Sequence, residues 1–254
     1  LDGKIVSIDF NREKKYSPTT TVLNYLRSLP DHKGTKEGCA EGDCGACTVV
    51  LGSLNKKNRI QYNAIDSCLV FLPMIHGKQL ITIENLKSGD GKLHPVQQAM
   101  IESHASQCGF CTPGIVMSIF SLYKSDLKPS RDIIEDTLYG NLCRCTGYVP
   151  IFEAAEKVCK KKRDDQFTKD ADKTVKMLKR INSNSLLLSG KKQKYFRPDS
   201  VKEALQLRKK NPTALLVSGA TDIALKVTKN HELIPKIIDL SSISSLTGIS
   251  RTKN

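Results

Sequence analysis

The spacing of four cysteines limits what the first part of this sequence can fold into. Cys39, Cys44 and Cys47 have four and two residues between them, and Cys68 follows after twenty intervening residues. Three thiols from one short segment and a fourth from elsewhere predict a tight loop around a metal group, which a separate element completes.

This spacing is the ligand pattern of plant-type [2Fe–2S] ferredoxins. Gly38, Gly42 and Gly45 lie among the cysteines. Glycine supplies the backbone freedom and the close approach of N–H groups to sulfur that such a loop needs. Zinc sites usually pair two short-spaced motifs, and disulfides require an oxidising compartment. The pattern therefore favours an iron–sulfur cluster over zinc or disulfides.

A second set of four cysteines follows in the middle of the chain. Cys108 and Cys111 precede a predicted helix, and Cys143 and Cys145 follow a predicted helix stop. On spacing alone a zinc site is an open alternative. Its position beside the first set favours a second [2Fe–2S] cluster. The ninth cysteine, Cys159, lies on an apolar helix stripe and is expected to be a core residue.

Hydrophobic periodicity divides the chain into four segments. Residues 1–85 are rich in β signals and predict a small α+β unit with long loops. Residues 86–160 predict four short helices in a compact bundle. The elements expected in the first segment are strands at Lys4–Phe10, Cys47–Leu51, Ile60–Ala64 and Gln79–Thr82, with a helix at Thr20–Ser28.

The four helices of the second segment have clear start and stop signals. The expected starts are His94-Pro95, Pro113, Ser130 and Pro150, with a stop at Gly140-Asn141.

The last two segments differ in composition. Residues 161–189 are charged and polar, with Ser183, Asn184 and Ser185 in the middle, and predict a linker. From residue 190 a helix is expected at Val201–Lys209, with strands at Ala214–Val217 and Lys236–Leu240. Because the pattern opens as if part-way into a strand and stops before a third domain is complete, we expect a fragment.

Composition excludes several classes of protein. The chain is 39% hydrophobic and 26% charged, a globular balance. No apolar run approaches the roughly 20 residues of a membrane-spanning helix. The formal charge of +14 comes from scattered lysines with interleaved acidic residues, so we expect no nucleic-acid partner. The five histidines are dispersed, and no catalytic residue is expected in this chain.

Three motifs resemble those of the xanthine dehydrogenase/aldehyde oxidase family. They are residues 34–48 (GTKEGCAEGDCGACT), 107–114 (QCGFCTPG) and 140–148 (GNLCRCTGY). Residues 195–198 (YFRP) and 216–223 (LVSGATDI) resemble the start of that family's FAD-binding domain.

The resemblance implies an α+β multidomain fold. A β-grasp plant-type [2Fe–2S] ferredoxin domain would occupy residues 1–85 and a four-helix [2Fe–2S]-binding domain residues 86–160. A linker at 161–189 would lead to the beginning of an α/β FAD-binding domain of the PCMH type at 190–254, which is incomplete here.

The resemblance also implies the site residues. Cys108, Cys111, Cys143 and Cys145 would hold the cluster nearest molybdenum, and Cys39, Cys44, Cys47 and Cys68 the cluster nearest FAD. Gln107 would contact the pterin. The expected FAD contacts are Leu216, Val217, Ser218, Gly219, Ala220, Thr221, Asp222 and Ile223, in which Gly219 allows close approach to a diphosphate.

The implied activity is that of an oxidoreductase subunit. Electrons would pass from a molybdenum–pterin centre on a large partner subunit, through both clusters, to FAD and then NAD⁺ during purine hydroxylation. A cytoplasmic heterotetramer or larger assembly, with no membrane partner, is expected. Two alternatives stay open: a related hydroxylase acting on aldehydes, nicotinate or carbon monoxide, and a zinc-binding, Cys-rich interaction protein. Many related hydroxylases carry FAD on a separate chain, so the FAD-like segment argues against them.

Overall fold

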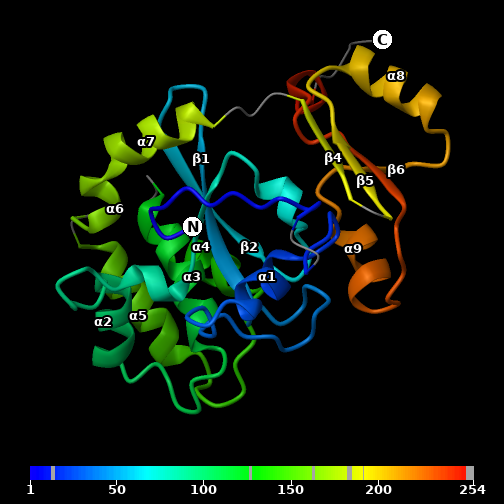
Figure 1. Cartoon of the computed structure of the whole chain (residues 1–254). Coiled ribbons are helices and arrows are strands. Elements are labelled where there is room, and N and C mark those ends of the chain that lie inside the picture. Colours follow the sequence, from blue (N-terminus) through cyan, green and yellow to red (C-terminus); the bar gives the residue numbers. More distant parts are fainter. Residues whose placement is uncertain (13–14, 126–127, 162–163, 182–184, 191, 250–254) are drawn as a thin grey trace, which may run out of the picture.

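The computed structural model describes residues 1–254 except 13–14, 126–127, 162–163, 182–184, 191 and 250–254. Figure 1 shows two groups of elements, a larger one that carries the N-terminus and a smaller one that carries the C-terminus. In chain order the described elements are α1 (Val22–Ser28), β1 (Thr48–Leu54), β2 (Ile60–Asp66), η1 (Leu72–Ile75), β3 (Gln79–Ile81), η2 (Ile83–Leu86), α2 (Pro95–Glu102), α3 (Thr112–Lys124), α4 (Arg131–Leu138), α5 (Val149–Cys159), α6 (Gln166–Lys169), α7 (Ala171–Arg180), β4 (Leu186–Ser189), β5 (Lys194–Arg197), α8 (Val201–Lys210), β6 (Leu215–Val217), α9 (Thr221–Thr228), β7 (Lys236–Asp239) and η3 (Ser244–Leu246).

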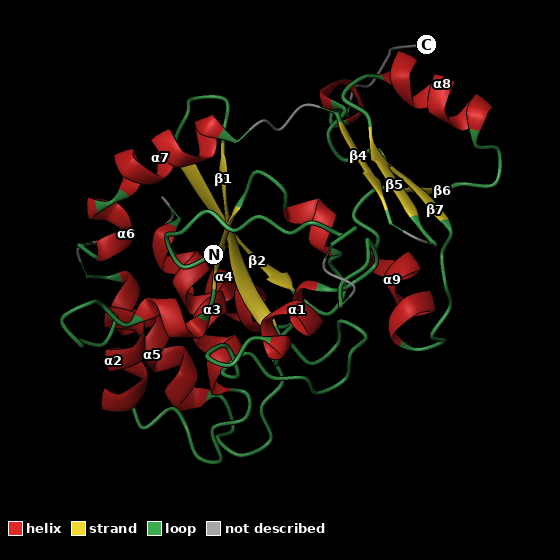
Figure 2. Cartoon of the chain, in the orientation of Figure 1, coloured by secondary structure: helices red, strands yellow, loops and turns green. Residues whose placement is uncertain are grey.

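The described strands form two separate sheets (Figure 2). The first has the order β2-β1-β3 and is antiparallel. The second has the order β4-β5-β7-β6, with β4 antiparallel to β5 and the other neighbours parallel. Helices accompany both sheets, so the chain has the mixed, multidomain α+β fold that the sequence predicts.

The first domain combines α1 with the antiparallel sheet. Thr21 begins α1 because its hydroxyl accepts a hydrogen bond from the Asn24 N–H at 3.1 Å. Helix α1 buries Val22, Leu23 and Leu26. The first residues of β1 are buried on both faces, since helices cover one side and the loops around α1 the other. The strands predicted near residues 47–51, 60–64 and 79–82 are confirmed within a few residues.

The strand predicted at Lys4–Phe10 is wrong. These residues have no regular structure, and Ile5 and Val6 are 58% and 48% exposed. A strand needs a partner to satisfy its backbone, and no described strand pairs with this segment. A bond of 3.5 Å from the Asp2 N–H to the Leu80 carbonyl is the backbone contact between this end of the chain and β3. Alternating apolar residues therefore predicted a strand here, although the segment has no strand beside it to pair with among the described residues.

The four helices of the second domain begin where the sequence predicts. His94 caps α2, and Gln97 returns a hydrogen bond to the His94 N–H in a capping box. Ser130 caps α4 by accepting from the Ile133 N–H. Helix α3 is almost wholly buried and lies at the centre of the bundle.

The first two domains share one hydrophobic core. Val50 of β1, Ile81 of β3 and Leu86 pack in the same buried cluster as residues of α2 to α5. Helix α3 lies against both β1 and β2. The boundary near residue 85 stays a prediction, but the two domains pack against each other and do not have separate cores.

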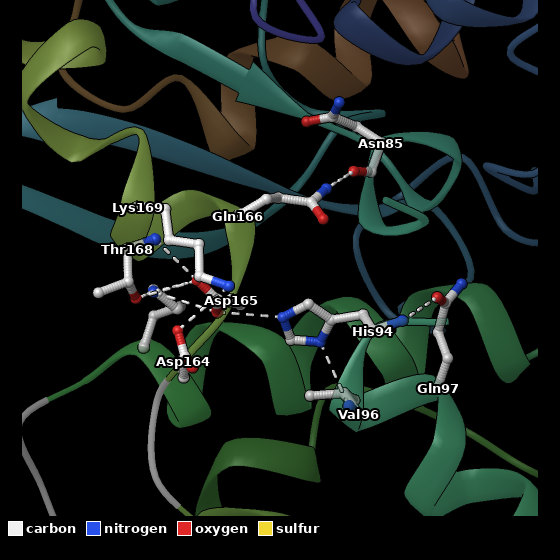
Figure 3. Close-up of polar contacts among 10 residues, drawn as sticks. Asn85, His94, Val96, Gln97, Asp164, Asp165, Gln166, Thr168 and Lys169 are labelled. Atoms are coloured by element: carbon white, nitrogen blue, oxygen red, sulfur yellow. Dashed lines mark hydrogen bonds and ion pairs between the residues drawn. The ribbon is translucent and has the colours of Figure 1, made fainter. Parts of the chain in front are cut away.

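The segment predicted as a linker contains regular structure. Helices α6 and α7 and strand β4 all fall within residues 161–189. Asp165, which is buried, accepts a hydrogen bond from His94 at 3.1 Å, and Figure 3 shows the His94 ring pointing toward it. Lys124 of α3 completes the cluster at 2.9 Å from Asp165. Ser183 and Asn184 lie outside the described residues, and the boundaries at residues 160 and 190 stay predictions.

Charge pairing explains how Asp165 tolerates burial. Burial alone would raise its pKa, but the His94 hydrogen bond and the Lys124 ammonium outweigh this and hold the pKa well below its usual value. The His94 Nδ1 accepts a bond from the Val96 N–H, so Nε2 carries the proton donated to Asp165. This cluster fixes the start of α6 to the helical domain.

The last segment forms the second sheet and its helices. The predicted helix near 201–209 and strands near 214–217 and 236–240 are confirmed, while β4, β5 and α9 are additional. Helix α8 begins at a Ser200 cap, whose hydroxyl accepts from the Glu203 N–H. No helix among the described residues combines the length and apolar character needed to cross a membrane.

Candidate iron–sulfur and flavin sites

The first quartet of cysteines lies where the loop after α1 meets the ends of two strands. Cys47 directly precedes β1, and Cys68 follows β2 by two residues. Because β1 and β2 pair antiparallel over their full lengths, these strand ends bring the two thiols together. Cys39 and Cys44 come from the loop before β1. We name this group the loop quartet.

Mutual effects on pKa group the thiols of the loop quartet in two pairs, Cys39 with Cys44 and Cys47 with Cys68. The hydrogen bond from Cys68 lowers the pKa of Cys47. The same bond, together with burial, raises the pKa of Cys68. Cys47 is therefore the member of this pair that ionises more readily, and the thiolate is the form that binds metal.

Backbone amides also converge on the loop quartet. Burial would raise the pKa of Cys39, but the N–H groups of Glu41 and Asp43, each 3.4 Å from its sulfur, help to lower it. Gly42 and Gly45 have φ angles of +85° and +65°, which side-chain-bearing residues rarely adopt. Glycine thus lets the loop turn N–H groups toward sulfur, as the sequence predicts.

The second quartet lies at the starts of two helices. Cys111 occupies the N-cap position of α3, with Cys108 three residues before it, while Cys143 and Cys145 lie between α4 and α5. Cys145 donates to the Cys108 sulfur at 3.6 Å. Burial raises the pKa of Cys111 to about 12, and its hydrogen bond with Cys143 adds to the rise. We name this group the helix quartet.

Part of the helix quartet is open to solvent. Cys108 and Cys145 are both exposed. Gln107 lies beside them, with its side-chain amide donating to the Cys145 carbonyl at 3.1 Å. Phe110 and Leu142 are 50% and 55% exposed in the same two loops. Thiols and apolar side chains therefore share one surface.

A buried asparagine joins the two quartets. The Leu142 N–H donates to the Cys44 carbonyl at 3.0 Å, so one hydrogen bond connects the two cysteine loops. Asn141, 4% exposed, donates to the Gly45 carbonyl at 3.0 Å and accepts from the Ser118 hydroxyl at 2.6 Å. These contacts fix the loops of the two quartets against each other.

The predicted flavin motif, residues 216–223, spans the end of β6 and the start of α9. Gly219 and Ala220 have φ angles of +85° and +63° and make the turn between them. Val217 and Ala220 are buried, whereas Thr221 and Asp222 are exposed at the helix start. Turns at helix N-termini suit phosphate groups, and FAD contact by these residues stays a prediction.

The donor sets fit two-iron clusters. A [2Fe–2S] cluster takes four thiolates, two on each iron, and the eight thiols form four pairs, two in each quartet. A Cβ added at Gly38 would lie 2.8 Å from the Cys44 sulfur, so only glycine fits there without a shift. Among the described residues, no three His, Cys, Asp or Glu side chains converge as they would on a single ion.

Two domain families match the chain. Residues 82–156 match the "[2Fe-2S] binding domain", and residues 190–254 match the "FAD binding domain in molybdopterin dehydrogenase". Together with the thiol quartets, these matches define the class as an iron–sulfur and FAD-binding region of molybdopterin-dependent oxidoreductases.

Curated relatives narrow the class. The chain is 47% identical to a xanthine dehydrogenase/oxidase of Felis catus, over 56% of this chain and 11% of the relative. It is 34% identical to a xanthine dehydrogenase of Drosophila pseudoobscura pseudoobscura, over 93% of this chain and 20% of the relative. It is 43% identical to aldehyde oxidase 3 of Mus musculus, over 63% and 12%.

The chain belongs to the xanthine dehydrogenase/aldehyde oxidase family, and it corresponds to the iron–sulfur and FAD region that transfers electrons. Members of this family carry molybdenum on a partner domain or chain. The chain spans between 11% and 20% of the length of these three relatives.

Two residues of the site were missed by the sequence analysis. Asn141 belongs to the predicted helix stop and to the 140–148 motif, but the sequence analysis gives its side chain no role in joining the two cysteine loops. Lys229 reaches the loop quartet from the end of α9. Because it is 190 residues from its contact, no local pattern indicates it.

Proposed function

We propose that this chain is the electron-transfer part of a xanthine dehydrogenase-type enzyme. Two [2Fe–2S] clusters would carry single electrons from a molybdenum–pterin centre on a large partner subunit to FAD, and then to NAD⁺. The observation that carries the proposal is the arrangement of eight thiols as two paired quartets whose loops share a backbone hydrogen bond.

The chain's own residues have distinct tasks in this proposal. A bound cluster supplies reversible one-electron chemistry. Backbone N–H groups at Cys39 and the N-terminal ends of α3 and α5 stabilise negative charge on sulfur. The proposed ligands are Cys39, Cys44, Cys47 and Cys68 in the loop quartet, and Cys108, Cys111, Cys143 and Cys145 in the helix quartet.

The surroundings of the quartets support the direction of transfer. Cys47 and Cys68 lie in one buried cluster with Tyr195 and Val217 of the FAD-type segment. Cys108 and Cys145, by contrast, are exposed. We therefore assign the loop quartet to the flavin side and the helix quartet to the molybdenum side.

The cofactor contacts follow from this assignment. Gln107, beside the exposed thiols, would contact the pterin of the partner chain. Residues 216–223 would contribute to FAD binding through the turn before α9. The domain limits proposed for this function are 1–85, 86–160 and 190–254, with 161–189 between the last two.

Metal content and spectroscopy test the clusters. The anaerobically purified chain should contain about four iron atoms, absorb in the visible range, and give two distinct paramagnetic resonance signals after reduction with dithionite. A Cys159→Ser variant is the matched control, because Cys159 belongs to neither quartet, and should keep all the iron. A colourless protein that contains zinc would overturn the proposal in favour of a Cys-rich interaction protein.

The substrate requires the partner chain. We propose purine hydroxylation, but the identity of 43% to an aldehyde oxidase gives aldehyde oxidation specific support as a second candidate. Hypoxanthine, xanthine, an aldehyde and nicotinate should be added in turn to the assembled anaerobic enzyme. The proposal expects purines to reduce the clusters fastest, and rapid reduction by an aldehyde alone would replace the substrate without changing the role of this chain.

A further inference from the structure

A lysine of the FAD-type segment contacts the loop quartet directly. Lys229 ends α9, and its ammonium donates to the Cys39 carbonyl at 3.0 Å. The same ammonium lies 2.9 Å from a carboxylate oxygen of Glu41. The contact therefore joins a ligand residue of the first domain to the segment that resembles a flavin-binding domain.

Packing determines where this lysine lies. Ala224 of α9 and Ala220 directly before it belong to the same buried cluster as Cys47 and Cys68. In Figure 1, α9 lies beneath the second sheet, on the side of the loops around α1. Because apolar packing docks α9, Lys229 does not depend on a flexible reach across solvent.

A second, buried contact fixes the same interface. The Gln193 side chain donates to the Thr19 hydroxyl at 3.0 Å and to the Ile234 carbonyl at 2.8 Å. Thr19 and Gln193 are both buried. The position of the FAD-type segment on the first domain is thus determined by both apolar and polar contacts.

We propose that Lys229 is a positioning residue that holds the ligand loop at Cys39 and raises the reduction potential of the cluster bound by the loop quartet. The inference rests on the proposed function, since it presupposes that cluster. A reduced cluster carries one more negative charge than an oxidised one, so a nearby cation favours reduction. Glu41 acts in the opposite direction.

This arrangement links the potential to domain docking. The cation comes from the FAD-type segment, so the loop quartet has this charge environment only while that segment is docked. Without Lys229, the Glu41 carboxylate of the same loop would lack this counter-charge. The ligand loop would then bind the oxidised, less negative form more favourably.

The size of the effect follows from exposure. The side chains of Lys229 and Glu41 are 44% and 38% exposed, so water and salt screen their charges. At low salt, loss of the Lys229 charge should change the equilibrium constant for one-electron reduction of the cluster about threefold. This corresponds to a shift of ~28 mV in its reduction potential, since a tenfold change is 59 mV. The change should shrink as ionic strength rises.

The test is a redox titration of the full chain, in which paramagnetic resonance measures the reduction potential of each cluster signal. Lys229→Met should lower the potential of one signal, Glu41→Gln should raise it, and the double variant should lie near the unmodified protein. Lys229→Arg should keep the original potential. Lys226→Met is the matched control, because Lys226 lies on the same helix but pairs with Glu232 at 3.7 Å, and should change nothing.

Several outcomes would overturn the inference. They are an unchanged potential in Lys229→Met, or shifts of the same sign in Lys229→Met and Glu41→Gln, as expected if the pair only braces the loop. A shift in the helix-quartet signal would equally contradict it. If the proposed function itself were wrong, the result would differ, because the unmodified chain would then not show two resonance signals and about four iron atoms.

Discussion

The two thiol quartets differ most in how much of the protein surrounds them. In the loop quartet, Cys47 and Cys68 are 3% and 1% exposed. In the helix quartet, Cys108 and Cys145 are open to solvent. Two thiols of the loop quartet are buried by this chain, including its FAD-type segment, whereas two thiols of the helix quartet are exposed, and the other four have intermediate exposure.

The quartets are also built from different elements. The loop quartet depends on glycine turns and on the ends of two paired strands. The helix quartet depends on the starts of α3 and α5, where helix dipoles favour negative charge. Exposure and construction thus differ together: the loop quartet uses a glycine loop and strand ends, and the helix quartet uses the loops that lead into two helices.

Removing one ligand from each quartet should have the largest effect. Cys68→Ser and Cys145→Ser should each lose about half of roughly four iron atoms and one resonance signal. Cys68→Ser should also lower the free energy of unfolding by about 1–3 kcal/mol more, because it places a hydroxyl in a buried apolar cluster. Iron analysis measures the loss of metal, and thermal melting measures the loss of stability. Equal destabilisation by Cys68→Ser and Cys145→Ser would contradict the difference in burial between the quartets.

The contact between the quartets should matter nearly as much. Asn141→Ala would leave the buried Ser118 hydroxyl without its Asn141 acceptor and would remove one of three donors to the Gly45 carbonyl, which keeps the Thr48 N–H and hydroxyl, at a cost of about 1–3 kcal/mol. Denaturant unfolding measures the loss. Asn63→Ala, on the exposed strand β2, is the matched control and should change stability by less than about 0.5 kcal/mol. Similar losses in both variants would show that the two loops do not depend on Asn141.

Thiol reactivity of the metal-free chain compares the quartets directly. Cys108 is exposed, and hydrogen bonds from the Phe110 N–H and from Cys145 lower its pKa. Cys47 also has a lowered pKa but is buried. Iodoacetamide at pH 7.5 should therefore modify Cys108 at least about tenfold faster. Peptide mass spectrometry gives both rates, and equal rates would mean that the loop quartet opens readily.

The smallest effect concerns pH and the docking of α6 beside the helical domain. The pKa of Asp165 is depressed in the folded protein and about 3.9 when unfolded. Its contribution to stability is therefore complete above about pH 5 and is lost as the pH falls toward the folded value. Hydrogen exchange of α6, corrected for intrinsic rates, should be constant from pH 8 to 5 and should increase below about pH 4.

An Asp164→Asn variant is the control for this pH profile. Asp164 is exposed and pairs with Lys169 at 3.4 Å, so its removal should leave the profile unchanged. Protection of α1, beside the loop quartet, should not follow that of α6. Loss of both together near pH 4 would indicate one cooperative unit and would weaken the distinction between the two regions.

Prediction from the sequence succeeded where chemistry is local. Caps such as Ser130 and the Pro-led helix starts lie within a few residues of what they determine. It failed at Lys4–Phe10, because alternation predicts a strand but does not provide its partner. Strands β4 and β5 are short and carry little periodicity, and the contact of Lys229 with Cys39 joins distant residues.

The buried cluster that unites Cys68 with Tyr195 and Val217 has an evolutionary consequence. If a gene split separated α7 from β4, this interior would become an obligate subunit interface, and each half would expose an aggregation-prone apolar face until it met the other. Keeping both halves on one polypeptide guarantees their equal stoichiometry. Lineages that encode the halves separately should therefore show either co-regulated synthesis or polar replacements at these positions.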